Sequence, residues 1–122
     1  MEKYNSPAIG NEISCVMRGI DPILLSDNQR LKQKLLDALK HDGFHVLDRA
    51  DYEFNPEGYT LVVLLAESHV SIHTYPEYNS LYFGLYSCRG ENDGIKTYEV
   101  FKEGLKPVSV DFIQRPISVG KK

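Results

Sequence analysis

The densest group of reactive side chains lies between residues 67 and 88. Carboxylates, imidazoles, hydroxyls and a thiol occur there together, at Glu67, Ser68, His69, Ser71, His73, Glu77 and Cys88. They follow directly after residues 61–66, the most apolar run in the chain. Polar side chains buried at the end of such a run are costly unless they find partners. Their position therefore indicates either a hydrogen-bonded strand end or a site with chemistry.

The residues alone leave three interpretations open. These polar groups could be hydrogen-bonded structural residues at strand ends. His69 and His73 could bind a metal, but this spacing aligns two imidazoles on a helix, and Pro76 argues against a helix here. Ser68 or Cys88 could act as a nucleophile with His73 as its base. Against this hydrolase interpretation, no glycine-framed turn surrounds Ser68.

Length, charge and cysteine content limit the class of protein. A chain of 122 residues is long enough for one core and too short for two. The formal net charge of −3 gives no general attraction to nucleic acid or anionic lipid, so neither is expected as a partner. No apolar run approaches the ~20 residues that cross a bilayer, and no apolar signal segment is seen. The two cysteines, Cys15 and Cys88, are too few for a disulfide framework. Together, these observations predict a small cytoplasmic domain.

The order of elements predicts an α+β fold. Hydrophobic periodicity and turn residues predict strands at residues 12–18, 44–53, 61–66, 70–75, 81–87 and 108–114. Helices are predicted at residues 28–42 and 95–105. This order favours a two-layer sandwich, mainly an antiparallel sheet with two helices on one face. Neither face of strand 81–87 is plainly polar, so we expect a homodimer that packs sheet on sheet.

Residues 66–77 carry a resemblance to a known family. The run Ala-Glu-Ser-His-Val-Ser-Ile-His-Thr-Tyr-Pro-Glu is similar to the signature of the prokaryotic S-adenosylmethionine decarboxylases, which are pyruvoyl-dependent enzymes. Cys88 follows Ser68 by 20 residues, as the family's cysteine does. Upstream, residues 54–58 match the family's turn of aromatic, proline and glycine residues. The resemblance is strong over about residues 44–90.

The resemblance implies that the chain is a proenzyme that cuts itself between Glu67 and Ser68. Its products would be a β chain of residues 1–67 and an α chain of residues 68–122. Ser68 would become a pyruvoyl group, whose carbonyl forms a Schiff base with the substrate amine and accepts electrons as CO2 leaves. No bound organic cofactor and no metal would be required.

The same resemblance implies roles for four further residues. His73 would assist the processing step, as a base or by orienting the ester intermediate. Cys88 would return a proton to the substrate Cα after decarboxylation. Phe54 would stack on adenine, and Glu77 would hold the ribose hydroxyls. The substrate would be S-adenosylmethionine, and the product the aminopropyl donor for spermidine synthesis.

The spacing of Ser68 and His73 adds a geometric expectation. They are an odd number of residues apart, so a straight strand would place them on opposite faces. We therefore predict a bulge or a sharp bend near Ser68.

Some positions depart from the family pattern and leave alternatives open. Glu12 stands where the family usually has histidine, and Arg89 separates Cys88 from Gly90. Some relatives decarboxylate L-arginine or L-ornithine with the same machinery, and Glu12 could hold the cationic end of such a substrate. A non-catalytic dimeric α+β module, or an inactive paralogue, is the alternative outside the enzymes.

Overall fold

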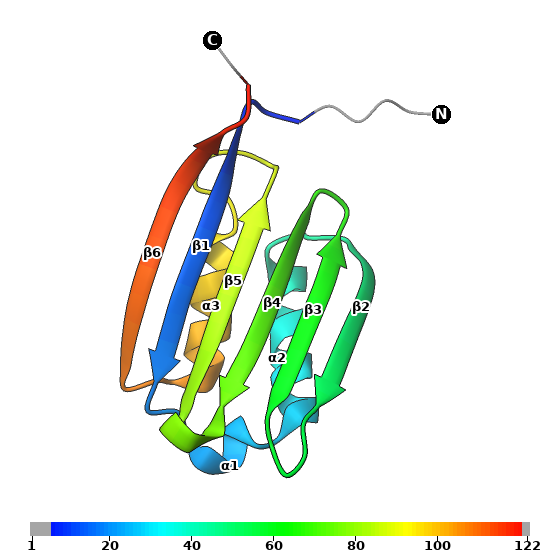
Figure 1. Cartoon of the computed structure of the whole chain (residues 1–122). Helices are drawn as coiled ribbons and strands as arrows, with labels where there is room; N and C mark the ends of the chain where they lie inside the picture. Colours follow the sequence, from blue (N-terminus) through cyan, green and yellow to red (C-terminus); the bar gives the residue numbers. More distant parts are fainter. Residues whose placement is uncertain (1–5, 121–122) are drawn as a thin grey trace.

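The computed structural model describes residues 6–120 and divides them into six strands and four short or medium helices (Figure 1). Residues 1–5 and 121–122 lie outside the described part. The strands are β1 (Ile9–Arg18), β2 (Val46–Glu53), β3 (Tyr59–Leu65), β4 (Ser68–Tyr75), β5 (Ser80–Ser87) and β6 (Ser109–Ser118). The helices are α1 (Pro22–Leu25), α2 (Asn28–His41), the 3-10 helix η1 (Pro76–Tyr78) and α3 (Ile95–Leu105).

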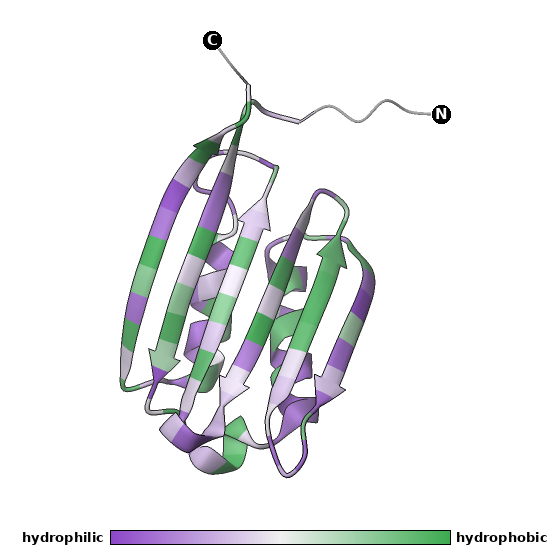
Figure 2. Ribbon diagram, viewed as in Figure 1, coloured by the Kyte–Doolittle hydropathy of each residue, from purple (hydrophilic) through white to green (hydrophobic). Residues whose placement is uncertain are grey.

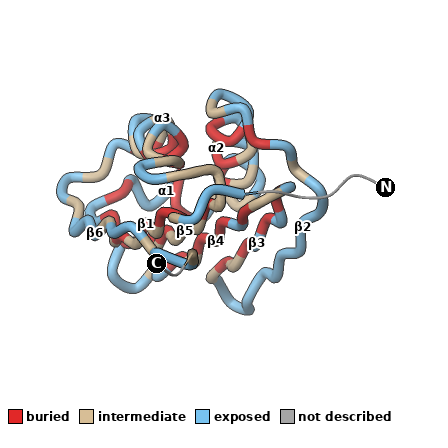
Figure 3. The backbone as a smooth tube through the Cα atoms, turned by 90° about the horizontal axis from the view of Figure 1, so that it is seen from above, coloured by how far each residue is buried: buried red, intermediate tan, exposed pale blue. Residues whose placement is uncertain are grey.

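All six strands form one antiparallel sheet in the order β2-β3-β4-β5-β1-β6. Seen from above, α2 and α3 lie on one side of this sheet (Figure 3). The opposite side, here called the open face, carries no helix in the described part of the chain. The predicted two-layer α+β sandwich with an antiparallel sheet is confirmed.

Helix α2 shows how the sequence fixes the second layer. Asp27 caps its start, with the side chain accepting a hydrogen bond from the Arg30 backbone N–H at 3.2 Å. The side chains that recur at helical spacing are buried against the sheet: Leu31, Leu35, Ala38 and Leu39. Asp42 ends the helix, and Gly43 follows with a positive φ of 75°.

The central strands alternate between the two faces. In β4, Val70 and Ile72 are fully buried on the helix side, while the exposed His69 and the half-buried His73 lie on the open face. Strand β3 is hydrophobic over all but its first two residues, whereas β2 at the sheet edge is largely polar (Figure 2). Val62 and Leu64 of β3 remain exposed on the open face. That face therefore combines a polar centre with apolar groups beside it.

Some details differ from the sequence predictions. Strand β1 begins at Ile9 instead of residue 12, and β6 continues to Ser118 instead of ending at residue 114. The short helix α1 at residues 22–25 was not predicted. A bend at Ala66 and Glu67 lies directly before Ser68, as expected, but the register of β4 stays regular from Ser68 to Tyr75. A bulge occurs instead in β2, between Val46 and Asp48.

Candidate active site

Ser68 lies at a tight connection between two central strands. Strand β3 ends at Leu65 and β4 begins at Ser68, so Ala66 and Glu67 alone make the turn. Ser68 is 7% exposed and pairs with Ser87 of β5 across the sheet. The Glu67–Ser68 peptide bond is therefore held between two strands at the end of the sheet.

The backbone N–H of Cys88 contacts two oxygens that would take part in self-cleavage, the attacking hydroxyl of Ser68 and the carbonyl oxygen of Glu67. It donates to the Glu67 carbonyl oxygen at 3.2 Å and to Ser68 Oγ at 3.3 Å. Attack of Ser68 Oγ on the Glu67 carbonyl carbon would place negative charge on that carbonyl oxygen. A fixed N–H aimed at the oxygen stabilises such charge, as in an oxyanion hole. Glu67, Ser68 and Cys88 thus come together in a geometry suited to an acyl shift.

A charged network follows Cys88 directly. The Arg89 guanidinium donates two hydrogen bonds to the Asp93 carboxylate, from Nε at 2.8 Å and from a terminal nitrogen at 3.1 Å. Burial lowers the pKa of Arg89, but the hydrogen bond and charge of Asp93, with the charges of Asp42 and Glu67, raise it overall. The guanidinium therefore stays charged, with the Glu67 carboxylate among the anions near it.

The network also joins the two helices to the end of the sheet. The guanidinium carbon of Arg89 lies 3.6 Å from the centre of the Phe44 ring. One Arg89 nitrogen donates to the Asp42 carbonyl oxygen at 3.0 Å. The Asp42 carboxylate accepts from the Thr97 backbone N–H at 2.9 Å and from its hydroxyl at 2.7 Å. Sequence reasoning noted Arg89 only as a departure from the family pattern. It missed Asp42, Phe44 and Thr97, which lie far from Arg89 along the chain and form no motif with it.

His73 is not near Ser68 within one chain. It lies on the open face, five residues further along β4, which is about 16 Å at ~3.3 Å per residue. Thr60 Oγ1 is 3.0 Å from His73 Nδ1, and the Tyr82 ring centre is 5.9 Å from the imidazole. The bend before Ser68 does not bring the two side chains to the same face. Thr60, which fixes the imidazole, was also missed by sequence reasoning.

Phe54 and Glu77 lie at the far end of the sheet from Ser68. Glu77 is in η1, which follows the end of β4, and Phe54 is in the turn before β3, whose first residues pair with the last of β4. The length of β4, eight residues, separates both from Ser68 by about 25 Å. Phe54 is 51% exposed, and its ring packs edge-on against Tyr52 at 4.9 Å. One chain therefore presents two separate groups of predicted site residues.

Glu12 already has a cationic neighbour. Arg115 Nε donates to Glu12 Oε1 at 2.8 Å, and the two residues pair across β1 and β6. Both side chains are well exposed. A cationic substrate at Glu12 would therefore have to displace or share Arg115.

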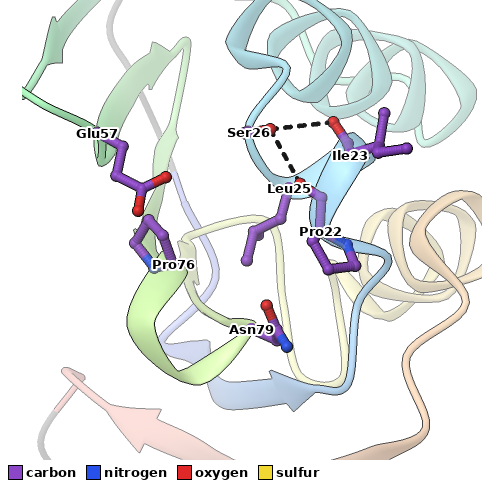
Figure 4. A pocket seen from close by; sticks show the side chains of 7 residues that line it. All are labelled: Pro22, Ile23, Leu25, Ser26, Glu57, Pro76 and Asn79. Carbon is purple, nitrogen blue, oxygen red and sulfur yellow. Dashed lines mark hydrogen bonds between the residues drawn. The ribbon is translucent and has the colours of Figure 1, made fainter.

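The remaining surface offers less chemistry. A groove of about 350 Å³ lies between α1, η1 and the β2–β3 turn (Figure 4). It is lined by Pro22, Ile23, Leu25, Ser26, Glu57, Pro76 and Asn79, so it has one carboxylate and no nucleophilic thiol or imidazole. Among residues 6–120, no three His, Cys, Asp or Glu side chains gather as metal ligands. No helix in that range is long and apolar enough to span a bilayer.

Comparison with known proteins decides the family. A family model described as S-adenosylmethionine decarboxylase matches residues 12–115. The chain belongs to the S-adenosylmethionine decarboxylase family. An S-adenosylmethionine decarboxylase proenzyme of Picrophilus torridus is 30% identical over 105 residues, which cover 86% of this chain and 81% of that one. Another, of Aeropyrum pernix, is 35% identical over 111 residues, covering 91% and 82%.

A solved structure gives the same answer for the fold. The crystal structure of the adenosylmethionine decarboxylase from Aquifex aeolicus matches with a TM-score of 0.86 and 25% identity, over 94% of this chain and 95% of that one. The family predicted from residues 54–88 is thus confirmed, as is its class, the pyruvoyl-dependent decarboxylases. The matches favour S-adenosylmethionine decarboxylation over the arginine, ornithine and non-catalytic alternatives.

Proposed function

We propose that the chain is a proenzyme that cuts itself between Glu67 and Ser68 and then decarboxylates S-adenosylmethionine. The observation that carries this proposal is the Cys88 N–H, which lies within hydrogen-bond distance of both the Glu67 carbonyl oxygen and Ser68 Oγ. These residues fit a pyruvoyl precursor, because the serine hydroxyl and the peptide bond before it share one fixed donor. The proenzyme names of the relatives support the same conclusion.

The cut follows from the chemistry of Ser68. Its Oγ loses a proton and bonds to the Glu67 carbonyl carbon, while the C–N bond breaks and the nitrogen takes up a proton, leaving an ester. Loss of the Ser68 Cα proton then breaks the Cβ–Oγ bond, and the Glu67 carboxylate leaves. Water replaces the nitrogen of the resulting dehydroalanine, releasing ammonia and leaving a pyruvoyl group at the start of the 68–122 chain.

The pyruvoyl carbonyl would supply an electrophile for the substrate amine and a sink for the electrons that CO2 leaves behind. The chain's own contribution at that stage is a proton. Cys88 follows the end of β5 next to Ser68, and its half-buried thiol is the proposed donor to the substrate Cα. The backbone N–H of Cys88 would therefore assist self-cleavage, and its side chain would assist the later decarboxylation.

A second copy of the chain would complete the site. Phe54, Glu77 and His73 are each far from Ser68 in one chain, and the open face leaves Val62 and Leu64 exposed. Packing two open faces together would cover these apolar groups. We assign the partner copy the tasks of assisting the cut through His73 and of holding the nucleoside through Phe54 and Glu77.

A denaturing gel and mass spectrometry test the first half of the proposal. The wild-type chain should separate into fragments 1–67 and 68–122, the second beginning with a pyruvoyl group, whereas Ser68→Ala should stay whole. Processed protein should then release labelled CO2 from S-adenosylmethionine and not from arginine or ornithine. A wild-type chain that keeps an intact serine at position 68 after long incubation would refute the proposal. Turnover of arginine or ornithine alone would refute only the substrate.

A further inference from the structure

Both neighbours of Cys88 are tied to a single carboxylate. Ser87 Oγ donates to Asp93 Oδ2, and the same hydroxyl accepts the Arg89 backbone N–H at 3.0 Å. The Arg89 side chain donates hydrogen bonds to both carboxylate oxygens of Asp93. The residues on either side of the Cys88 N–H are therefore fixed by one aspartate, five residues further along the chain.

Asp93 is itself held by the sheet. Its carbonyl oxygen accepts a hydrogen bond from Asn11 Nδ2 at 2.7 Å, and Asn11 is fully buried in β1. Gln114 of β6 donates to Asn11 Oδ1 at 3.2 Å and to Asn92 Oδ1 at 2.8 Å. The loop that carries Asp93 is thus anchored to two strands, and it cannot shift without breaking several of these bonds.

This arrangement matters because the Cys88 N–H lies just beyond the last residue of β5. A donor at a strand end is free to turn unless its neighbours are held. An oxyanion donor is effective only when its direction is set before the charge develops. Ser87 is fully buried, and Asp93 and Arg89 are each only 23% exposed, so water competes weakly for these bonds.

We propose that Asp93 is the positioning residue for self-cleavage: through Ser87 and Arg89 it holds the Cys88 N–H on the Glu67 carbonyl oxygen. It touches neither reacting atom, and its effect falls on the first step, formation of the ester. The inference rests on the proposed function and deepens it by assigning a task to the network around Arg89.

The test measures two steps separately. Hydroxylamine cleaves an ester between residues 67 and 68 but leaves the peptide bond intact, so it reports whether the ester has formed. In Asp93→Asn, which keeps the size of the side chain but loses its charge and one acceptor, self-cleavage should slow at least tenfold, and hydroxylamine should not restore it. In His73→Ala, whose imidazole we assign to the elimination that follows ester formation, hydroxylamine should accelerate cleavage.

Two further variants serve as a control and as a second test of the network. Asp111→Asn removes an exposed ion pair with Arg18, 2.6 Å long, toward the other end of β1, and should cut at the wild-type rate. Ser87→Ala removes one hydroxyl of the network and should slow the same first step, which keeps the test decisive if Asp93→Asn folds poorly. All rates are measured well below each variant's melting temperature.

The outcomes are distinguishable. Wild-type cutting by Asp93→Asn and Ser87→Ala, rescue of either by hydroxylamine, or an equal slowing in Asp111→Asn would each overturn the role of Asp93. These results would leave self-cleavage itself untouched. A wild-type chain that stays whole with and without hydroxylamine would instead overturn the proposed function, and this inference with it.

Discussion

At the scale of single residues, Cys88 offers two groups with different tasks. The backbone N–H contacts the Glu67 carbonyl oxygen and Ser68 Oγ, while the thiol is the proposed proton donor. Replacing the side chain leaves the N–H in place. The two tasks can therefore be separated by one substitution.

We predict that Cys88→Ala still cuts itself at a rate close to that of the wild type but loses decarboxylation by a factor of about 100 or more, the range for a general acid. Fragment formation on a gel and release of labelled CO2 measure the two effects. Cys15→Ala is the matched control: Cys15 is buried on the helix side, where burial raises its pKa to about 12, and its loss should leave both rates unchanged. Failure of Cys88→Ala to cut would mean that the thiol, and not the N–H, acts in processing.

The residues of the site differ in how far the sequence could predict them. Glu67, Ser68 and Cys88 stand in one motif with fixed spacing, so the resemblance could predict them from the sequence alone. Asp93 and Arg89 act through contacts with Asn11 and Asp42, which lie far away along the chain. Such partners become neighbours only after the sheet and helices assemble.

At the scale of elements, strand β2 is the exposed edge on which Phe54 and the following turn depend. Besides its backbone pairing with β3, it is joined to the core by Asp51, which accepts a hydrogen bond from the hydroxyl of the buried Tyr59 at 2.6 Å. This bond is the main influence on the pKa of Asp51 and lowers it; partial burial opposes the shift, and Lys32 and Arg49 add to it.

We predict that Tyr59→Phe lowers the free energy of unfolding by about 1–2 kcal/mol at neutral pH, the lower part of the range for a hydrogen bond to a charged group, because the Asp51 carboxylate is partly exposed to water. Because the folded state depresses the Asp51 pKa, this stabilisation is fully present above about pH 4, the usual carboxyl pKa, and is lost as the pH falls through the lower folded value. Urea unfolding at several pH values, in a Ser68→Ala background that keeps the chain whole, measures it.

The exposed Tyr52 of the same strand supplies the control, since Tyr52→Phe should change the stability by less than about 0.5 kcal/mol. An equal loss in both variants, or a difference that persists at low pH, would contradict the role given to the Tyr59–Asp51 bond.

The elements themselves were largely predictable, and the exceptions have physical causes. Helix α2 and the apolar strands carry strong periodicity and clear caps, so their positions agree with the prediction to within a few residues. The predicted end of strand β6 at residue 114 was too early, since the strand continues past Pro116, which cannot donate a ladder hydrogen bond. As an edge strand, β6 tolerates this proline, which pairs with Asn11 on its inner side. Such an edge position is a property of the sheet order, which local sequence does not contain.

At the scale of the whole molecule, the separation of His73 from Ser68 makes the proposed dimer testable. We predict that His73→Ala chains, which should stay largely whole by themselves, are cut when they are refolded together with Ser68→Ala chains. The Ser68→Ala chain cannot be cut, but it carries the intact imidazole. A size tag on one chain lets mass spectrometry tell which of the two is cleaved.

Refolding His73→Ala chains with the double variant Ser68→Ala/His73→Ala is the matched control, and it should leave them whole. If the first mixture also leaves them whole, His73 acts within its own chain, which would then have to rearrange about β4. The sequence predicted an uncovered second face but not the proposed assignment of His73 to the partner copy, since that assignment follows from which end of β4 each residue occupies.

The sheet order has a consequence for the molecule after the proposed self-cleavage. Strands β1, β2 and β3 belong to residues 1–67, and β4, β5 and β6 to residues 68–122, yet β1 lies between β5 and β6. Of the five strand pairings within residues 6–120, three join one fragment to the other: β3 with β4, β5 with β1, and β1 with β6. Backbone hydrogen bonds between these strands would hold the two fragments together, so the proposed cut would not release them. Once denatured, however, the two fragments would be separate polypeptides, and their refolding would become a bimolecular reaction that dilution slows.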